Sequence, residues 1–305
     1  MMLRWTECVV ILGAVGLYGC VDSKSAGGPM VEAHRGGAGY WPANSITAVE
    51  GAIASGCESI EIDLFLAGDL VPVLSAYPFL DETTCTTVDG AWIDERVWLY
   101  TMRLDDLQAD YLCGAVPDPS FPGAAVDPAP LATLDDLIDV LESDPDLNVH
   151  LDMQYHPNVS HEPEVFAAEV MERWWAAGLP NPLTVTADRP ETLAAFDERA
   201  SQVDVTLTTG LNWPWLPPVG STSWVALWHE LITTIGFEDA VAEAVDAGAD
   251  GISIPVGLLQ KRWIERAHQE GITVLVGPVN DPKVQETMSR WGVDTISTDY
   301  PELQP

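Results

Sequence analysis

The stretch Ser59-Ile60-Glu61-Ile62-Asp63-Leu64 alternates apolar and polar side chains as a β-strand does. Because successive side chains of a strand point to opposite faces, Glu61 and Asp63 share one face. Two neighbouring carboxylates repel each other unless a cation or a proton lies between them. The stretch therefore predicts a strand that carries carboxylate ligands for a hard divalent metal ion.

From residue 30 onward, similar apolar runs alternate with amphipathic patterns. The other runs predicted as strands cover residues 30–33, 147–153, 183–186, 203–208, 251–254, 272–276 and 295–297. The patterns predicted as helices cover residues 46–54, 134–141, 164–177, 191–200, 240–247, 258–270 and 284–291. Glycines after the helices, such as Gly178, and prolines near helix starts, such as Pro163, agree with this division.

This order of elements predicts an α/β protein with a (β/α)8 TIM barrel over residues 30–305. A doubly wound open sheet is the alternative, and it is disfavoured because no Gly-x-Gly-x-x-Gly pattern follows a strand. Residues 74–130, rich in Pro, Asp and Thr, interrupt the alternation, as do residues 210–228. We expect the first to be a long insertion after the second strand, and both to lie on the substrate side.

Both interrupting stretches carry residues of structural interest. The second contains Trp213, Trp215, Trp224 and Trp228. These side chains either line an apolar wall for a lipid or alcohol moiety or pack the loop onto the barrel. Cys85 and Cys113 share the first stretch and are the predicted disulfide pair in an oxidising compartment. Cys57 is predicted to be a small buried hydrophobic residue.

The N-terminus has the layout of a bacterial lipoprotein signal peptide over residues 1–20. A short basic start is followed by a mostly apolar run over residues 9–17 and then by Leu17-Tyr18-Gly19-Cys20, in which Cys20 would be lipidated. Residues 21–29 are predicted to be a tether. The predicted location is extracytoplasmic, as a membrane-anchored lipoprotein of the periplasm or cell envelope. Plain secretion and a cytoplasmic protein with an apolar start are the alternatives.

The formal net charge of −34 excludes several partners. Nucleic-acid binding requires a basic footprint, which this chain lacks. Attraction to an anionic membrane surface is equally disfavoured, so membrane attachment is expected through a lipid anchor only. An anionic small molecule remains possible where a metal ion and an arginine reverse the local field.

The barrel brings further polar residues to the carboxylate pair, because active sites of this fold lie at the C-terminal ends of the strands. His34 and Arg35 follow the first predicted strand, and Asp152 lies near the end of the third. Glu61, Asp63 and Asp152 are therefore predicted to bind Ca²⁺ or Mg²⁺. His34 is predicted to carry a proton and Arg35 to bind an anion.

These motifs resemble those of the glycerophosphodiester phosphodiesterases. The resemblance lies in Ala33-His34-Arg35-Gly36-Gly37, in Pro42-Ala43-Asn44-Ser45 and in the residues from Gly56 to Asp63. Near the C-terminus it lies in Ala247-Gly248-Ala249-Asp250-Gly251 and in the residues from Gly292 to Pro301.

The resemblance implies divalent-metal-dependent hydrolysis of glycerophosphodiesters to glycerol 3-phosphate and an alcohol. The substrate would be a small-molecule glycerophosphodiester or a lipid head group. By resemblance, His34 and Arg35 are the catalytic residues, and Glu61, Asp63 and Asp152 hold the metal. Arg35 would bind the phosphate together with Gln154, which stands where the family commonly has a lysine.

The chain departs from the family after the second strand. The family usually carries a histidine and an aspartate where this chain has Ala76 and Tyr77. A methyl group transfers no proton, and losing one general acid or base costs about 10²- to 10⁴-fold in rate. Two alternatives to efficient catalysis follow: a pseudoenzyme that binds metal and phosphodiester, and an enzyme for substrates with a better leaving group.

Other side chains are candidates to replace the missing acid. His150 shares a strand face with Asp152, but a packed structural role is favoured for it. His156 and His161 follow that strand and are better placed at the mouth of the barrel. Tyr77 is a further candidate, although an ordinary phenol is a poor acid near neutral pH. His229 is predicted to be structural.

Overall fold

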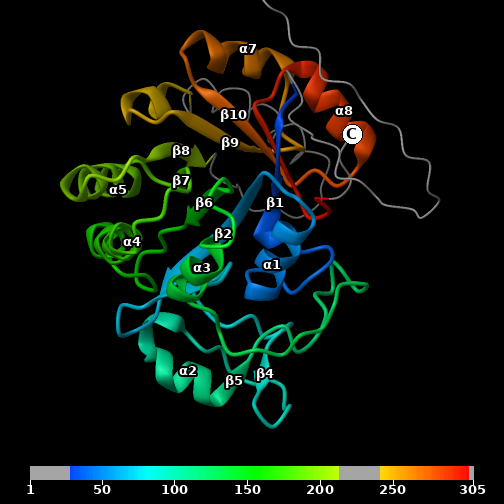
Figure 1. The fold of residues 1–305 in the computed structure, drawn as a ribbon, viewed down its shortest axis with the longest axis vertical. Helices are drawn as coiled ribbons and strands as arrows, with labels where there is room; N and C mark the ends of the chain where they lie inside the picture. Colours follow the sequence, from blue (N-terminus) through cyan, green and yellow to red (C-terminus); the bar gives the residue numbers. More distant parts are fainter. Residues whose placement is uncertain (1–27, 213–240, 302–305) are drawn as a thin grey trace, which may run out of the picture.

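The computed structural model describes residues 28–212 and 241–301. Eight parallel strands form a closed barrel (Figure 1). These are β1 (Met30–Ala33), β2 (Ser59–Leu66), β6 (Asn148–Met153), β7 (Leu183–Ala187), β8 (Thr208–Asn212), β9 (Gly251–Pro255), β10 (Thr273–Gly277) and β11 (Thr295–Thr298). The barrel closes because β1 pairs with both β11 and β2. The predicted TIM barrel is thereby confirmed.

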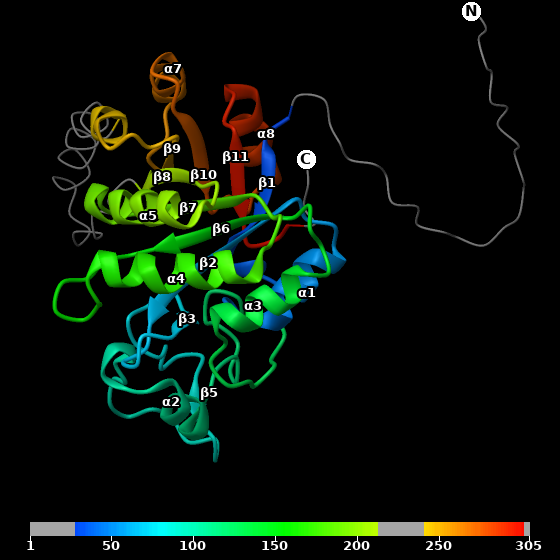
Figure 2. The same cartoon turned by 60° about the vertical axis from the view of Figure 1, so that its left-hand side comes forward.

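Helices cover the outside of the barrel (Figure 2). They are α1 (Ile46–Ala54), α3 (Leu134–Leu141), α4 (Pro163–Ala177), α5 (Pro190–Val203), α7 (Lys261–Gln269) and α8 (Pro282–Trp291). Local sequence sets several of their ends: the Ser45 hydroxyl caps α1, Thr133 and Asp136 form a capping box on α3, and Gly178 ends α4 in the left-handed region. Their apolar faces and the strands share one large core.

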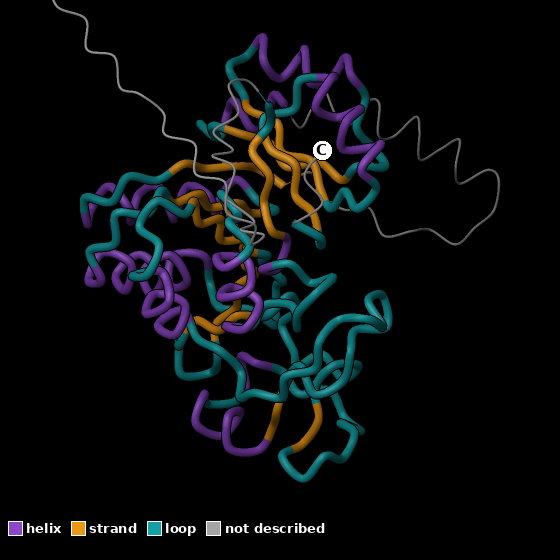
Figure 3. The backbone as a smooth tube through the Cα atoms, turned by 45° about the vertical axis from the view of Figure 1, so that its right-hand side comes forward, coloured by secondary structure: helices purple, strands orange, loops and turns teal. Residues whose placement is uncertain are grey.

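The insertion after β2 begins with β3 (Pro72–Leu74), which pairs antiparallel to β2. It continues through β4 (Thr86–Thr87), a 3-10 turn at Leu99–Thr101, α2 (Leu104–Asp110) and β5 (Tyr111–Leu112). Most of the insertion is loop, as Figure 3 shows. Its residues Leu80 and Leu99 share a small second core with Phe65 of β2. A disulfide joins Cys85 and Cys113, while Cys57 is a buried free cysteine.

One predicted element is displaced in the structure. The run over residues 203–208 was expected to be a strand, but α5 extends to Val203 and β8 starts only at Thr208. Asp204, with φ of 59°, ends the helix in the left-handed region. Val203, Val205 and Leu207 pack as partly buried residues against the core, which explains their strand-like alternation.

Several predictions lie outside the described residues. These are the signal peptide over residues 1–20 with Cys20, most of the tether, the four tryptophans between residues 213 and 228, and His229. Within the described ranges, no helix has the length and apolar character needed to cross a membrane.

Candidate metal and phosphodiester site

The turn after β1 positions the first site residues. His34, Arg35 and Gly36 form a single 3-10 turn in which Arg35 has φ of 53° and Gly36 φ of 77°. Gly36 is required there, because a Cβ atom on it would lie 2.7 Å from the Cβ of Ala48. Arg35 is strained by its left-handed conformation. Its backbone N–H donates to Glu61 Oε2 at 2.8 Å, so the strained turn is tied directly to β2.

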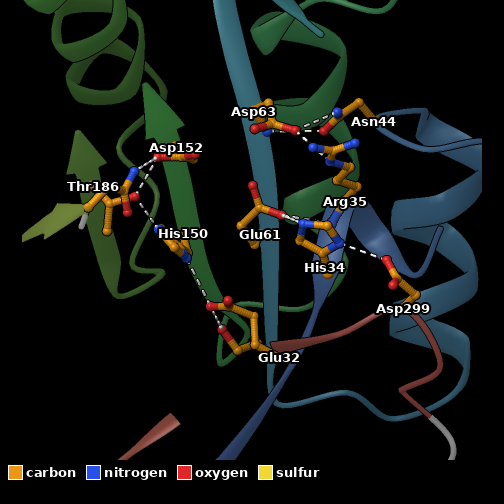
Figure 4. A network of polar contacts seen from close by, with 12 residues as sticks. Glu32, His34, Arg35, Asn44, Glu61, Asp63, His150, Asp152, Thr186 and Asp299 are labelled. Carbon is orange, nitrogen blue, oxygen red and sulfur yellow. Dashed lines mark hydrogen bonds and ion pairs between the residues drawn. The ribbon is translucent and has the colours of Figure 1, made fainter. Parts of the chain in front are cut away.

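Glu61, Asp63 and Asp152, here called the carboxylate triad, come together at the C-terminal end of the barrel. β2 and β6 pair so that Asp63 lies opposite Asp152. One oxygen from each of the three carboxylates lies within 4.8 Å of the others. Glu61 and Asp63 are buried and Asp152 is half-buried. Figure 4 shows Glu61 and Asp63 on β2 beside Asp152 on β6.

Neutral side chains orient two members of the triad. Asn44 donates through Nδ2 to Asp63 Oδ2 at 2.9 Å and accepts from the backbone N–H of Asp63. Thr186 Oγ1 donates to Asp152 Oδ1 at 2.7 Å, and Asn212 Nδ2 donates to the same oxygen at 2.5 Å. Such outer partners fix the direction of the second carboxylate oxygen, as in metal sites.

The charges of the triad conflict in the absence of a cation. Burial raises the pKa of Glu61 well above its usual value, and the charge of Asp63 raises it further. Burial and the charge of Asp63 also raise the pKa of Asp152. A hard divalent ion satisfies buried carboxylate oxygens and removes this repulsion. The triad therefore fits Ca²⁺ or Mg²⁺.

His34 is held by a carboxylate from the last strand. Its Nδ1 lies 2.7 Å from Asp299 Oδ1, while its Nε2 lies 3.9 Å from Glu61 Oε2. Asn280 Nδ2 donates to the second oxygen of Asp299 at 2.6 Å. Burial favours the neutral carboxyl of Asp299, but the hydrogen bond and charge of His34 outweigh burial and lower its pKa. Ionised Asp299 therefore keeps the proton on Nδ1 and leaves Nε2 free to take one.

Arg35 supplies the positive charge beside the triad. Its Nε lies 3.0 Å from Asp63 Oδ2. Burial disfavours the guanidinium, but the charges of Asp63 and Glu61 outweigh it and raise the pKa of Arg35 above its usual value. About a quarter of the side chain is exposed (26%), so the cation is fixed and still reachable from solvent. A planar guanidinium in this position can bind phosphate oxygens.

A buried ion pair lies beneath the triad. His150 Nδ1 donates to Glu32 Oε2 at 3.1 Å, and its Nε2 donates to Thr186 Oγ1 at 2.7 Å. Burial opposes the charge of the imidazolium, but Glu32 outweighs it and raises the pKa of His150 to about 9. His150 itself lowers the pKa of Glu32 against the effect of burial. Because both ring nitrogens of His150 are engaged, it has the structural role that was favoured for it.

This ion pair predicts a pH dependence of stability in the metal-free protein. The folded-state pKa of His150 exceeds the ordinary 6.5, so its stabilisation is complete below pH 6.5 and is lost as pH rises through about 9. At about 1.4 kcal/mol per pKa unit, the loss is on the order of 3 kcal/mol. Glu32→Gln should abolish most of this decline, as measured by urea unfolding in chelator between pH 6 and 10.

The exposed Glu58, on the loop before β2, offers the matched substitution. Glu58→Gln should retain the full decline of the unfolding free energy with pH. If Glu32→Gln and the parent protein lose stability in parallel, the buried pair does not control the pH dependence.

The other candidates for the missing acid differ in their surroundings. The ring of His156 stacks on Phe65 with centroids 6.0 Å apart, and His161 Nε2 donates to the carbonyl oxygen of Ala67 at 3.0 Å. Tyr77 stacks on Phe79 and is 42% exposed, but it also lies within electrostatic reach of Arg35. Ala76 follows β3 at the mouth of the barrel, where the backbone N–H of Ser75 donates to the carbonyl of Asp63. Position 76 itself carries no group that could donate a proton.

Several site residues were missed from the sequence. Asp299, Asn280, Asn44, Thr186, Asn212 and Glu32 were assigned no role. Asp299 directly follows β11, and its place at the end of a barrel strand was the signal that could have found it. Asn212 ends β8 and was hidden by the displaced strand prediction. Gln154, predicted to bind substrate, directly follows β6 and is half-buried two residues beyond Asp152.

Comparison with known proteins identifies the family. A sequence model of the glycerophosphoryl diester phosphodiesterase family matches residues 34–303. The chain belongs to this family. An uncharacterized protein of Mycobacterium tuberculosis strain H37Rv is 28% identical over 209 residues, which cover 66% of the chain and 63% of that protein. The chain therefore spans less than two thirds of the length of this curated relative.

Solved structures of the glycerophosphodiester phosphodiesterase type share the fold. A Silicibacter pomeroyi protein, described as a candidate glycerophosphoryl diester phosphodiesterase, is 20% identical with a TM-score of 0.75, covering 92% of this chain and 93% of that one. An Oleispira antarctica phosphodiesterase in complex with the product sn-glycerol-3-phosphate is 20% identical with a TM-score of 0.65, covering 90% and 94%. These similarities agree with the barrel observed in this family member.

Proposed function

We propose that the chain hydrolyses glycerophosphodiesters to glycerol 3-phosphate and an alcohol with the help of Ca²⁺ or Mg²⁺. The observation that carries this proposal is the convergence of the Asp299–His34 pair, Arg35 and the carboxylate triad at one end of the barrel. Family membership supports a phosphodiester substrate. The product bound to the Oleispira antarctica relative supports a glycerophosphate moiety.

The site residues have different roles in the proposed reaction. Glu61, Asp63 and Asp152 would hold the ion, which supplies Lewis-acid stabilisation of the phosphoryl oxygens. Arg35 binds the same anionic group through its guanidinium. His34 accepts a proton at Nε2 from the water molecule that attacks phosphorus, while Asp299 keeps the ring oriented. A new phosphorus–oxygen bond forms, the bond to the leaving alcohol breaks, and the alkoxide takes its proton from solvent, because position 76 carries only a methyl group.

Removal of one triad charge tests the metal assignment. Glu61→Gln keeps the size of the side chain but removes a charge that Ca²⁺ or Mg²⁺ requires. We expect metal affinity to fall by at least about tenfold and hydrolysis of glycerophosphocholine to fall with it. Calorimetric titration with each ion measures the first effect, and release of glycerol 3-phosphate measures the second.

An exposed glutamate provides the control for this substitution. Glu50→Gln on α1 removes the same charge from the surface and should change neither metal affinity nor turnover. Unchanged metal affinity in Glu61→Gln would refute the assignment. Metal binding without any turnover in the parent protein would instead favour a pseudoenzyme, the reading that Ala76 suggests.

The N-terminal sequence supports a further part of the proposal. We propose that Cys20 is lipidated and anchors the protein on the extracytoplasmic side of a membrane. Expression with a labelled fatty acid tests it, because Cys20→Ser should abolish both the labelling and the recovery in membranes. Labelling that survives Cys20→Ser would contradict the assignment.

A further inference from the structure

A cavity of about 390 Å³ lies beside the candidate site, between the β1–α1 loop and the insertion. Arg35 and Asn44 line this side cavity, and both residues also contact Asp63. The side cavity therefore reaches the guanidinium that would hold the phosphate. Its volume lies in the range of binding sites for small molecules.

Three chain segments form much of the wall of the side cavity: residues 41–47 before and at the start of α1, residues 74–77 at the end of β3, and the returning strap of the insertion, residues 113–130. Residues 80–85 and 131–136 contribute the rest, together with Arg35 and Gln108. The strap is fixed at several points. Cys113 is bonded to Cys85 and exchanges backbone hydrogen bonds with Ala129, and the backbone N–H of Ala125 donates to the carbonyl of Tyr40 at 2.8 Å. The walls are thus preformed.

The strap approaches the β1–α1 loop as closely as a backbone can. A Cβ atom on Gly114, whose φ is 68°, would lie 2.8 Å from the Cβ of Pro42. A side chain at this position would push the strap away from the loop. The distance between the strap and the β1–α1 loop at this point is consequently set by the backbone.

The lining of the side cavity is mainly apolar. It includes Leu74, Leu80, Leu131, Val116 and the Cys85–Cys113 disulfide. The three leucines are buried. This lining suits a hydrocarbon group, because removing apolar surface from water is favourable.

The carboxylates in the lining are already engaged in local turns. Asp81 accepts hydrogen bonds from Thr83, Asp118 from the backbone of Ser120, and Asp136 from Thr133. They disfavour an anionic end group in the side cavity. A neutral aliphatic group avoids this repulsion.

Ala76 and Arg35 both line the side cavity. The methyl group takes up little of the space that connects the guanidinium with the apolar walls. An imidazole, the side chain usual in the family at this position, would occupy that space. Alanine in place of histidine at position 76 therefore removes a proton donor and also leaves space between Arg35, which would bind the phosphate, and the apolar walls of the side cavity.

We propose that the side cavity binds an aliphatic chain attached to the phosphodiester that Arg35 holds. The preferred substrates would be lysophospholipid-like or alkyl phosphodiesters and not chain-free glycerophosphodiesters. This inference rests on the proposed function. Each methylene buried in the side cavity should strengthen binding about fourfold.

Binding and turnover are measured with chain-bearing and chain-free compounds. Calorimetry in Ca²⁺ compares octylphosphocholine with glycerophosphocholine and needs no turnover. Hydrolysis assays compare glycerophosphocholine with octanoyl lysophosphatidylcholine and with glycerophospho-octanol, which carry the chain on the glycerol and on the leaving alcohol, respectively. We expect octylphosphocholine to bind at least about tenfold more tightly than glycerophosphocholine. In the hydrolysis assays, the chain-bearing substrate that is cleaved faster shows which side of the phosphate enters the cavity.

Filling the side cavity tests its role directly. Ala129→Leu, on the strap, should weaken binding of octylphosphocholine by about tenfold and leave glycerophosphocholine within about twofold. Ala124→Leu is a second variant in the same lining, should Ala129→Leu fail to fold. Ala91→Leu makes the same change on the exposed part of the insertion and should affect neither compound.

The outcomes separate this inference from the proposed function. Hydrolysis of glycerophosphocholine with no gain from a chain overturns the inference and leaves the function standing. Affinity that follows the choline group and not the chain length also overturns it, as does binding of neither probe. Chain-dependent binding that Ala129→Leu removes supports the inference even if no compound is hydrolysed.

Discussion

His34→Ala is expected to lower kcat for glycerophosphocholine by about 10²- to 10⁴-fold. In the described site, His34 Nε2 faces the triad while Nδ1 is held by Asp299 at 2.7 Å, so this imidazole is the group placed to move the proton. Alanine removes that group and leaves Arg35 and the carboxylates in position. KM should change much less than kcat, because Arg35 supplies the contact with the phosphate.

The same barrel contains a matched control. His268 on α7 pairs with Asp294 at 2.8 Å, but that pair is exposed and precedes β11, at the end of the barrel opposite the site. His268→Ala should therefore leave kcat unchanged. If His34→Ala retains full activity in steady-state assays with saturating Ca²⁺, the assignment of His34 as the base is wrong.

Asp299→Asn is the informative companion to His34→Ala. An asparagine can stay beside His34 Nδ1, but it removes the negative charge that stabilises the protonated ring. Without that charge the ring binds its proton less tightly, so the pH–rate profile should shift to lower pH and kcat should fall. A lowered kcat with an unshifted profile would show that Asp299 only positions the ring. A surface substitution, in contrast, should change neither kcat nor the pH–rate profile.

Much of the fold followed from periodicity. The helices at residues 46–54 and 134–141 were predicted from their amphipathic patterns with the bounds that the structure has, and Ser45 and Thr133 cap their starts in the structure. The prediction for residues 203–208 was wrong because the helix end at Asp204 depends on a left-handed residue that is not glycine. Alternating Val203, Val205 and Leu207 pack against the core without forming that strand.

The site was predictable where barrel geometry determines it. Glu61, Asp63 and Asp152 lie on neighbouring parallel strands, with Asp63 opposite Asp152, so the fold alone brings them together. His34 and Asp299 are 265 residues apart, and their contact depends on closure of the barrel between β1 and β11. The side cavity depends on how the strap packs against Pro42, a tertiary contact with no local sequence pattern.

Ala76→His is expected to raise kcat for glycerophosphocholine by about 10²-fold or more. The backbone of the preceding residue is tied to β2, since the N–H of Ser75 donates to the carbonyl of Asp63, and Ala76 and Arg35 line the same cavity. We therefore expect an imidazole at position 76 to reach the phosphate group that Arg35 would bind. It would protonate the leaving alkoxide, whose proton otherwise comes from solvent. The rate for an aryl phosphodiester should rise far less, because that leaving group needs no proton.

Ala76→Phe separates the two consequences of enlarging this residue. Phenylalanine fills similar space without a titratable group, so it should weaken chain-bearing ligands as histidine does while leaving kcat for glycerophosphocholine low. A gain in kcat shared by both variants would show that shape, and not proton transfer, limits turnover. The expected result is a gain in kcat for Ala76→His alone and a loss of affinity for octylphosphocholine in both variants. Residue 76 would then determine substrate preference: histidine supplies a proton donor for polar glycerophosphodiesters, and alanine leaves space for an aliphatic chain.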